Sequence, residues 1–131
     1  MDEYGLNENS LEAFMLPQVE DIKFLDEMGF NMVLGTDTGN DFNFPGYSLH
    51  EEMQLMELGG MQQLDIIKMA TSNAARMLDV LDVLGSIEVG KVADMVLLNR
   101  NPLEKIEHTL AIEAVLKEGI IKERIDGSST R

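Results

Sequence analysis

The stretch from Asn31 to Gly39 constrains the fold more than any other part of the sequence. Its apolar residues, Met32 to Leu34, are consecutive rather than alternating with polar ones, which is typical of a strand covered on both faces in a parallel sheet. Asp37 follows at once, in a loop punctuated by glycines. Enzymes of the α/β class place catalytic or metal-binding groups at such strand ends. The stretch therefore predicts a buried strand that presents Asp37 as a functional group, with a turn-capping role for Asp37 as the alternative.

The composition indicates one globular domain, or part of a larger one. The chain has 131 residues, of which 44% are hydrophobic, and this length is usually one domain. It contains 10 methionines, which we interpret as adaptable core filling, with a methionine-lined binding groove as the alternative. Cysteine is absent, so disulfides and thiolate metal sites are excluded and a cytoplasmic location is expected.

The acidic charge of the chain argues against two classes of partner. With 24 acidic and 10 basic residues the formal net charge is -14, whereas nucleic acids and anionic membranes are bound by clustered lysine and arginine. A solvated acidic surface is the simplest interpretation, and cationic ligands stay open. The sequence has no apolar run that approaches the roughly 20 residues of a membrane span. It also begins without the basic segment of a signal peptide.

The residues before position 80 predict helices around the strand. Ser10 is expected to cap a short helix, and Pro17 to begin a second helix that Gly29 ends. Gly35 is expected to allow a close approach of backbone. Ser48 and Glu51 have capping-box spacing for a helix that ends at 59–60. Further helices are predicted over residues 62–70 and after a cap at 71–73, and the 38–47 loop is long enough to be functional.

The residues after position 80 predict a small β unit. A glycine-bracketed turn over 85–91 precedes a strand over 94–98 and a turn at Asn101. Two further strands, over 112–116 and 120–124, are expected to form a hairpin at Glu118-Gly119. The polar residues 126–131 form a tail.

The order of these motifs resembles the carboxyl-terminal part of the metal-dependent amidohydrolase superfamily, in the branch of imidazolonepropionase-like enzymes and prolidase-like dipeptidases. The resemblance covers roughly residues 17–124. It rests on Gly35-Thr36-Asp37, a Ser-Leu-His-x-Glu helix from Ser48, Thr-Ser-Asn-Ala-Ala-Arg from Thr71, and above all Gly-Ser-Ile-x-x-Gly-Lys-x-Ala-Asp from Gly85, which Val-Leu-Leu and Asn-Pro follow.

The resemblance implies an α/β fold in which residues 1–80 supply the last strand-helix units of a (β/α)₈ barrel. Residues 81–125 would then supply strands of a small β-sandwich. It implies that Asp37 is both a catalytic residue and a metal contact, carrying the proton of water bound to Zn²⁺ or another divalent metal. A carboxylate suits both roles. Lys91 and Asp94 would be structural, Asp94 by anchoring a turn.

The remaining metal ligands that the resemblance implies are missing from the sequence. The family draws a His-x-His pair, a carboxylated lysine or glutamate and two further histidines from other strands, whereas this chain has 2 histidines and no such pair. A catalytic zinc normally takes three protein ligands. His50 and His108 are both interpreted as surface residues. A cation site of His50 with Glu51 and Glu52 is the weaker alternative, because adjacent helix positions do not share a face.

Two hypotheses follow. In the first, the chain is a fragment of a hydrolase that cleaves the C–N bond of a cyclic amide or dipeptide, and is inactive without the missing amino-terminal portion. In the second, it is a non-catalytic remnant or interaction module that is stable as an oligomer. One or two strand-helix units cannot close an eight-stranded barrel, so self-association is the simplest way to cover the exposed strand edges. The sequence does not identify the substrate, because specificity is distributed over eight loops.

Overall fold

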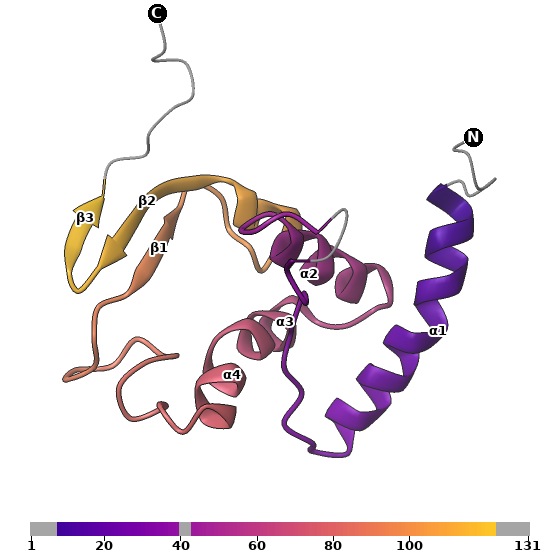
Figure 1. Cartoon of the computed structure of the whole chain (residues 1–131), viewed down its shortest axis with the longest axis horizontal. Coiled ribbons are helices and arrows are strands. Elements are labelled where there is room, and N and C mark those ends of the chain that lie inside the picture. The colour runs from indigo at the N-terminus through magenta and orange to yellow at the C-terminus, as the bar shows by residue number, and fades with distance from the viewer. Residues whose placement is uncertain (1–7, 40–42, 123–131) are drawn as a thin grey trace, which may run out of the picture.

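The chain consists of a helical region followed by a small antiparallel sheet (Figure 1). The computed structural model describes residues 8–39 and 43–122. The helices are α1 (Glu8–Glu27), α2 (Ser48–Leu58), α3 (Gln63–Ala70) and α4 (Ser72–Met77). The strands are β1 (Met95–Leu98), β2 (Ile112–Lys117) and β3 (Ile120–Lys122), with a 3₁₀ helix, η1 (Ile106–Leu110), before β2. Within the described residues, no helix combines the length and apolar character that crossing a membrane requires.

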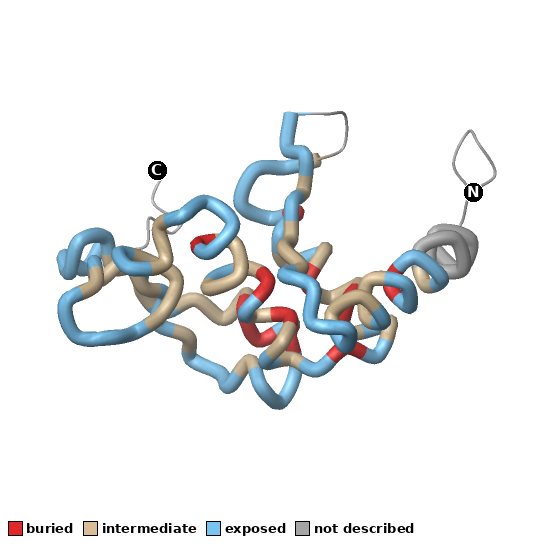
Figure 2. Tube along the Cα trace, turned by 90° about the horizontal axis from the view of Figure 1, so that it is seen from below, coloured by how far each residue is buried: buried red, intermediate tan, exposed pale blue. Residues whose placement is uncertain are grey.

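The core lies among the helices and is rich in methionine. Its buried members are Val19, Met53, Met56, Met61, Ile66, Met69 and Ile106, and in Figure 2 they gather at the centre of the molecule. Four of these seven are methionines, so the interpretation of methionine as core filling is confirmed for them. Ile106 comes from η1, so the second half of the chain completes a core that the helices build.

The segment predicted as a buried strand is extended but is not a strand. Met32 and Leu34 pack against the core as partly buried residues, and the Leu34 N–H donates to the Met69 carbonyl at 3.5 Å. No ladder partner flanks residues 30–37 in the described part of the chain. The prediction is wrong in this respect, because a strand is defined by its hydrogen-bonded neighbours as well as by its own residues. The close approach of backbone expected at Gly35 is also absent, since a Cβ added there would meet no described atom within 4 Å.

The start of the chain also differs from the prediction. Residues 8–27 form one helix that continues through Pro17, so Ser10 lies inside it and Pro17 begins no second helix. Pro17 is exposed, which places the lost backbone hydrogen bond of a helical proline on the solvent side. Gly29, at φ 86°, ends α1 as predicted, since the Gly29 and Phe30 N–H groups donate to the Asp26 and Leu25 carbonyls.

The capping box predicted at the start of α2 does not form. Tyr47 occupies the cap position without a side-chain hydrogen bond, and both the amide and the hydroxyl of Ser48 donate to the Phe44 carbonyl at 3.1 Å. The local turn at 44–47 therefore satisfies Ser48 and leaves Glu51 no role in a cap. Gly59 and Gly60 end the helix as predicted.

The sheet agrees closely with the prediction. β1 pairs with β2, and β2 with β3, both antiparallel. Glu118 (φ 54°) and Gly119 (φ 77°) form the hairpin turn, and positive φ at both central residues is the geometry that two-residue hairpins favour. The division near residue 80 stays a prediction, and the tail at 126–131 lies outside the described residues, as does the end of the predicted 120–124 strand.

Candidate functional site

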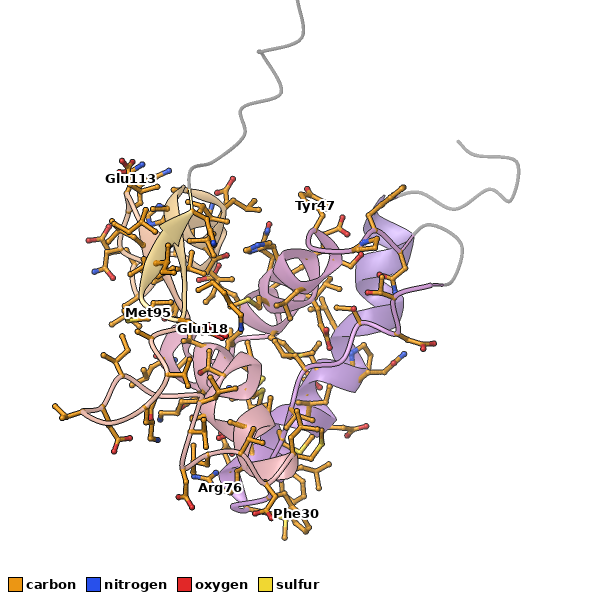
Figure 3. All side chains as sticks on the ribbon, turned by 60° about the vertical axis from the view of Figure 1, so that its left-hand side comes forward. Phe30, Tyr47, Arg76, Met95, Glu113 and Glu118 are labelled. Carbon is orange, nitrogen blue, oxygen red and sulfur yellow. The ribbon has the colours of Figure 1, made fainter. Side chains whose placement is uncertain are left out.

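Asp37 lies at the carboxyl end of the extended segment 31–37, which crosses the molecule on the way from Phe30 to Tyr47 (Figure 3). Its side chain is exposed, and its backbone is left-handed, with φ 49°. Aspartate and asparagine adopt this conformation more readily than other residues with a Cβ. The segment thus presents a carboxylate to solvent at the position that the sequence predicts.

Side chains from two later segments hold the backbone just before Asp37. The Gly35 N–H donates to Oε1 of Glu52, on α2, at 3.2 Å. The Asn43 side-chain amide donates to the Thr36 carbonyl, and the Thr36 and Thr38 hydroxyls are 2.6 Å apart. The peptide groups on either side of the Gly35–Thr36 bond therefore have side-chain partners from later in the sequence.

Glu52 places an ionisable carboxyl group in a partly buried position. It is half-buried, and burial raises the pKa of its carboxyl above the ordinary value of 4.5, while the hydrogen bond from Gly35 lowers it by a smaller amount. Its second oxygen, Oε2, is buried without a hydrogen-bond partner, as is Oδ1 of Asn43. Both orphan acceptors belong to the two side chains that hold residues 35–36.

A second polar cluster holds the amino end of the segment. Nδ2 of Asn31 donates to the Asn73 carbonyl at 3.1 Å, and Nδ2 of Asn73 donates to the Met32 carbonyl at 3.0 Å. Arg76 donates to Oδ1 of Asn31 at 2.9 Å, and Figure 3 shows Arg76 at the same end of the molecule as Phe30. Asn73 was predicted to help cap the helix that follows it, but α4 has no side-chain cap hydrogen bond and the Asn73 side chain contacts Met32 instead.

Of the two histidines, His108 is buried and His50 is half-buried. His108 is 5% exposed, and its Nδ1 is 2.7 Å from the Asn101 carbonyl, so that nitrogen carries the proton. Nδ1 of His50 is 2.8 Å from the Thr109 hydroxyl, and burial lowers the pKa of His50. The interpretation of His108 as a surface residue is wrong, and His50 is less exposed than predicted, because each side chain finds a partner in the 99–111 segment, which sequence spacing does not reveal.

The described residues do not fit a divalent metal by themselves. Across residues 8–39 and 43–122, no group of three histidine or acidic side chains comes together to hold an ion. This also excludes the alternative site of His50 with Glu51 and Glu52 within that part of the chain. Asp37 does not line either of two hollows on the surface. One is lined by Glu51, Glu57 and Glu107 among others, and the other lies beside Ser86 and Lys91.

Asp94 and Lys91 have the structural roles that were predicted. Asp94 accepts hydrogen bonds from the Lys117 ammonium and, at 2.8 Å, from the Glu118 N–H. These two bonds, Lys117 first, lower the pKa of Asp94. Lys91 donates to the Ser86 hydroxyl and lies 3.1 Å from the Glu88 carboxylate. Both residues anchor turns of the second half of the chain.

Comparison with known proteins identifies relatives over most of the chain. The model of the amidohydrolase family matches residues 17–122. A Xaa-Pro dipeptidase solved with methionine bound in its active site is 32% identical, with a TM-score of 0.70 over 81% of this chain. A putative prolidase from Bifidobacterium longum is 29% identical, with a TM-score of 0.73 over 94% of the chain. Molinate hydrolase is 29% identical, with a TM-score of 0.70 over 79%.

This chain is much shorter than these relatives. It spans 25% of the Xaa-Pro dipeptidase, 31% of the B. longum protein and 25% of molinate hydrolase. The comparison with curated proteins gave no match.

Proposed function

The chain belongs to the amidohydrolase family, and we propose that it is the part of a metal-dependent hydrolase that presents Asp37 to the C–N bond of a cyclic amide or dipeptide. At the level of the family the activity is that of a hydrolase. In this proposal, residues 30–37 take the place of the last strand of a (β/α)₈ barrel, and β1 to β3 belong to a small β-sandwich beside it.

The single observation that carries the proposal is the way segment 31–37 is held. Asn73 contacts its amino end and Glu52 its carboxyl end, so the exposed Asp37 follows a backbone that side chains of α4 and α2 restrain. Positioned groups of this kind are what catalytic sites require.

Asp37 is proposed as both catalytic residue and metal contact, and the other ligands of a zinc or similar ion are proposed to come from polypeptide beyond the described residues. A catalytic zinc takes three protein ligands, and the described part of this chain brings no three together. We therefore expect the chain alone to be inactive, and purified chain to contain no stoichiometric zinc by elemental analysis. Stoichiometric zinc that disappears on Asp37→Asn would place a complete site within this chain.

A chimera tests the role of Asp37 directly. This chain would replace the matching quarter of the Xaa-Pro dipeptidase, and hydrolysis of Xaa-Pro dipeptides would be measured. Asparagine tolerates left-handed backbone, so Asp37→Asn removes the carboxylate with little change of conformation. Because a positioned acid or base contributes roughly 10²–10⁴-fold to a rate, we expect kcat/KM to fall within that range.

Asp79→Asn is the matched control for this experiment. Asp79 is also exposed and also left-handed, with φ 58°, but it follows α4 and not the segment that ends at Asp37. Its substitution is expected to leave activity unchanged. Full activity of the Asp37→Asn chimera, or a folded chimera without any hydrolysis, would contradict the proposal.

A second candidate is a non-catalytic module that self-associates, and one surface favours it. Alternate residues of a strand share a face, so the register places Met95, Leu97, Ala114, Leu116 and Ile121 on one side of the sheet. Leu97 is 54% and Ile121 65% exposed, so this apolar face is incompletely covered. Sedimentation of the chain tests the idea: an oligomer that Leu97→Lys dissociates, but Val96→Lys on the opposite face does not, would support it. A monomer at high concentration would count against it.

A further inference from the structure

We propose that Glu52 is a positioning residue that sets the backbone conformation of Gly35 to Asp37 through its hydrogen bond to the Gly35 N–H. The importance of this bond for catalysis rests on the proposed function of Asp37. The bond itself is a property of the chain alone. It joins α2 to a residue 17 positions earlier.

Gly35 is the point in the segment where such a bond has the greatest effect. Glycine has the widest backbone freedom of any residue, and a Cβ at this position would meet nothing within 4 Å in the described structure. Packing therefore does not restrain Gly35. The direction of the peptide before it depends on the acceptor of its N–H, which is Oε1 of Glu52.

The peptide that joins Thr36 to Asp37 is also held by a side chain. The Thr36 carbonyl accepts a hydrogen bond from Asn43, and Asp37 follows with its left-handed backbone. Glu52 and Asn43 thus restrain the two residues that lead into Asp37. Since a rotation at Gly35 would move the Asp37 carboxylate, the Glu52 contact contributes to the direction in which that carboxylate points.

Stability gives no reason for a carboxylic acid at position 52. Met53 and Met56 of the same helix are buried in the core, and the Glu52 carboxyl is half-buried beside them with Oε2 lacking a partner. Burying an unsatisfied polar oxygen is unfavourable. Residues that break local packing rules are found at positions where function needs them, and the contact to Gly35 is what this residue gains.

The test measures amide hydrogen exchange by NMR on the whole chain in wild type, Glu52→Leu and Glu52→Gln. Leucine leaves the Gly35 N–H without its acceptor, and a net hydrogen bond of about 1 kcal/mol corresponds to a roughly fivefold change. We expect Gly35 to exchange several times faster in Glu52→Leu, and the chemical shifts of Asp37 to move away from their left-handed values. Glutamine retains an acceptor oxygen, so Glu52→Gln is expected to restore both signals.

Two controls separate positioning from a general loss of structure. Glu51→Leu changes the neighbouring, exposed glutamate of the same helix turn and should leave Gly35 unaffected. The Gly59 amide, which donates to the Leu55 carbonyl at 3.0 Å, reports whether α2 is intact and should exchange equally in every variant.

The wild-type chain provides a further measurement that needs no substitution. The Gly35 amide proton resonance is expected to shift as Glu52 ionises, with the same midpoint as the Glu52 carboxyl carbon, whereas the Gly59 resonance should not follow it. If Glu52→Leu unfolds the chain, this shift and the Glu52→Gln result decide the question. A Gly35 resonance that ignores Glu52, or a Glu52→Gln variant in which Gly35 loses protection, would overturn the proposal. None of these measurements depends on activity, so an inactive chimera refutes the proposed function alone.

Discussion

The helical region and the sheet both contain many apolar residues, but these residues are buried to different extents. Six of the seven core residues lie between positions 19 and 69, and the seventh, Ile106, comes from η1. Every residue of β1, β2 and β3 is half-buried or exposed. The sheet therefore has an apolar face without a second layer to cover it fully, and a sheet of this kind normally packs against another element. The helices and η1 thus share one buried core, whereas the apolar face of the sheet is only partly covered.

The strongest contrast in stability separates these two regions directly. Ile66 is fully buried and Ile121 is 65% exposed. Truncation of a buried isoleucine to alanine costs about 2–5 kcal/mol, so Ile66→Ala should lower the free energy of unfolding by an amount in that range. Ile121→Ala should change it by less than about 0.5 kcal/mol. Urea denaturation followed by circular dichroism measures both, and equal losses would show that the sheet is as well packed as the helices.

A glycine pair tests how tightly α1 packs on α2. A Cβ on Gly59 would lie 2.2 Å from Cγ1 of Val19, whereas a Cβ on Gly35 meets nothing within 4 Å in the described structure. Overpacking of this kind costs about 1–3 kcal/mol, so Gly59→Ala should destabilise by roughly that amount. Gly35→Ala should stay within about 0.5 kcal/mol of wild type. A tolerated Gly59→Ala would indicate that α1 moves away from α2 easily.

His50 tests the contact that joins the two regions, because it links α2 to Thr109 of η1. Burial lowers its pKa below 6.5, so the unfolded chain binds the proton first as the pH falls. The stabilising contribution of neutral His50 is therefore present above pH 6.5 and decreases as the pH falls through 6.5 towards the folded pKa. The loss of stability between about pH 7.5 and about pH 5.5 should be smaller in His50→Gln than in wild type. Identical losses would show that His50 does not contribute.

The smallest expected effect is the pH dependence of the hydrogen bonds that Asp94 accepts in the sheet. Lys117 and the Glu118 N–H lower the pKa of Asp94 below 3.8, so its contribution is present above that value and is lost as the pH falls through the folded pKa. The protection factor of the Glu118 amide, which is its exchange rate relative to that of an unstructured amide at the same pH, should fall at acid pH in wild type and be low at all pH values in Asp94→Ala. Glu113→Gln, on the polar face of β2, is the control that should retain the wild-type profile. Because the Asp94–Lys117 pair lies near the surface, where ion pairs contribute little, global stability should scarcely change.

Turn chemistry was predictable from the sequence because it is local. Gly29, the 59–60 pair and Glu118-Gly119 end helices or form the hairpin where expected, since backbone that requires positive φ selects glycine within a few residues. The helices α2 and α3 and all three strands followed from apolar spacing in the same manner. The family resemblance also needed only the order of the motifs.

The errors arose where groups outside the predicted motif provided hydrogen-bond partners or where the neighbours that the motif needs were missing. Ser48 has the spacing of a capping box, but the turn at Phe44 satisfies it first. His108 looks like a surface residue in sequence, yet the Asn101 carbonyl makes its burial possible. The run at 32–34 has strand composition, but a strand also needs neighbours, and the described residues provide none.

The order of the amino acids was enough to specify the family and several of the turns, while Asp37 as a site residue stays a prediction. What holds Asp37 in place emerged from the folded chain, because Glu52 and Asn73 reach segment 31–37 across 17 and 41 positions. A periodic pattern indicates which face of a helix or strand is apolar. It does not indicate which distant backbone N–H a carboxylate such as that of Glu52 will bind. Contacts of that kind exist only once the helices have packed, since the core around Ile66 brings α2 and α4 to the two ends of the segment.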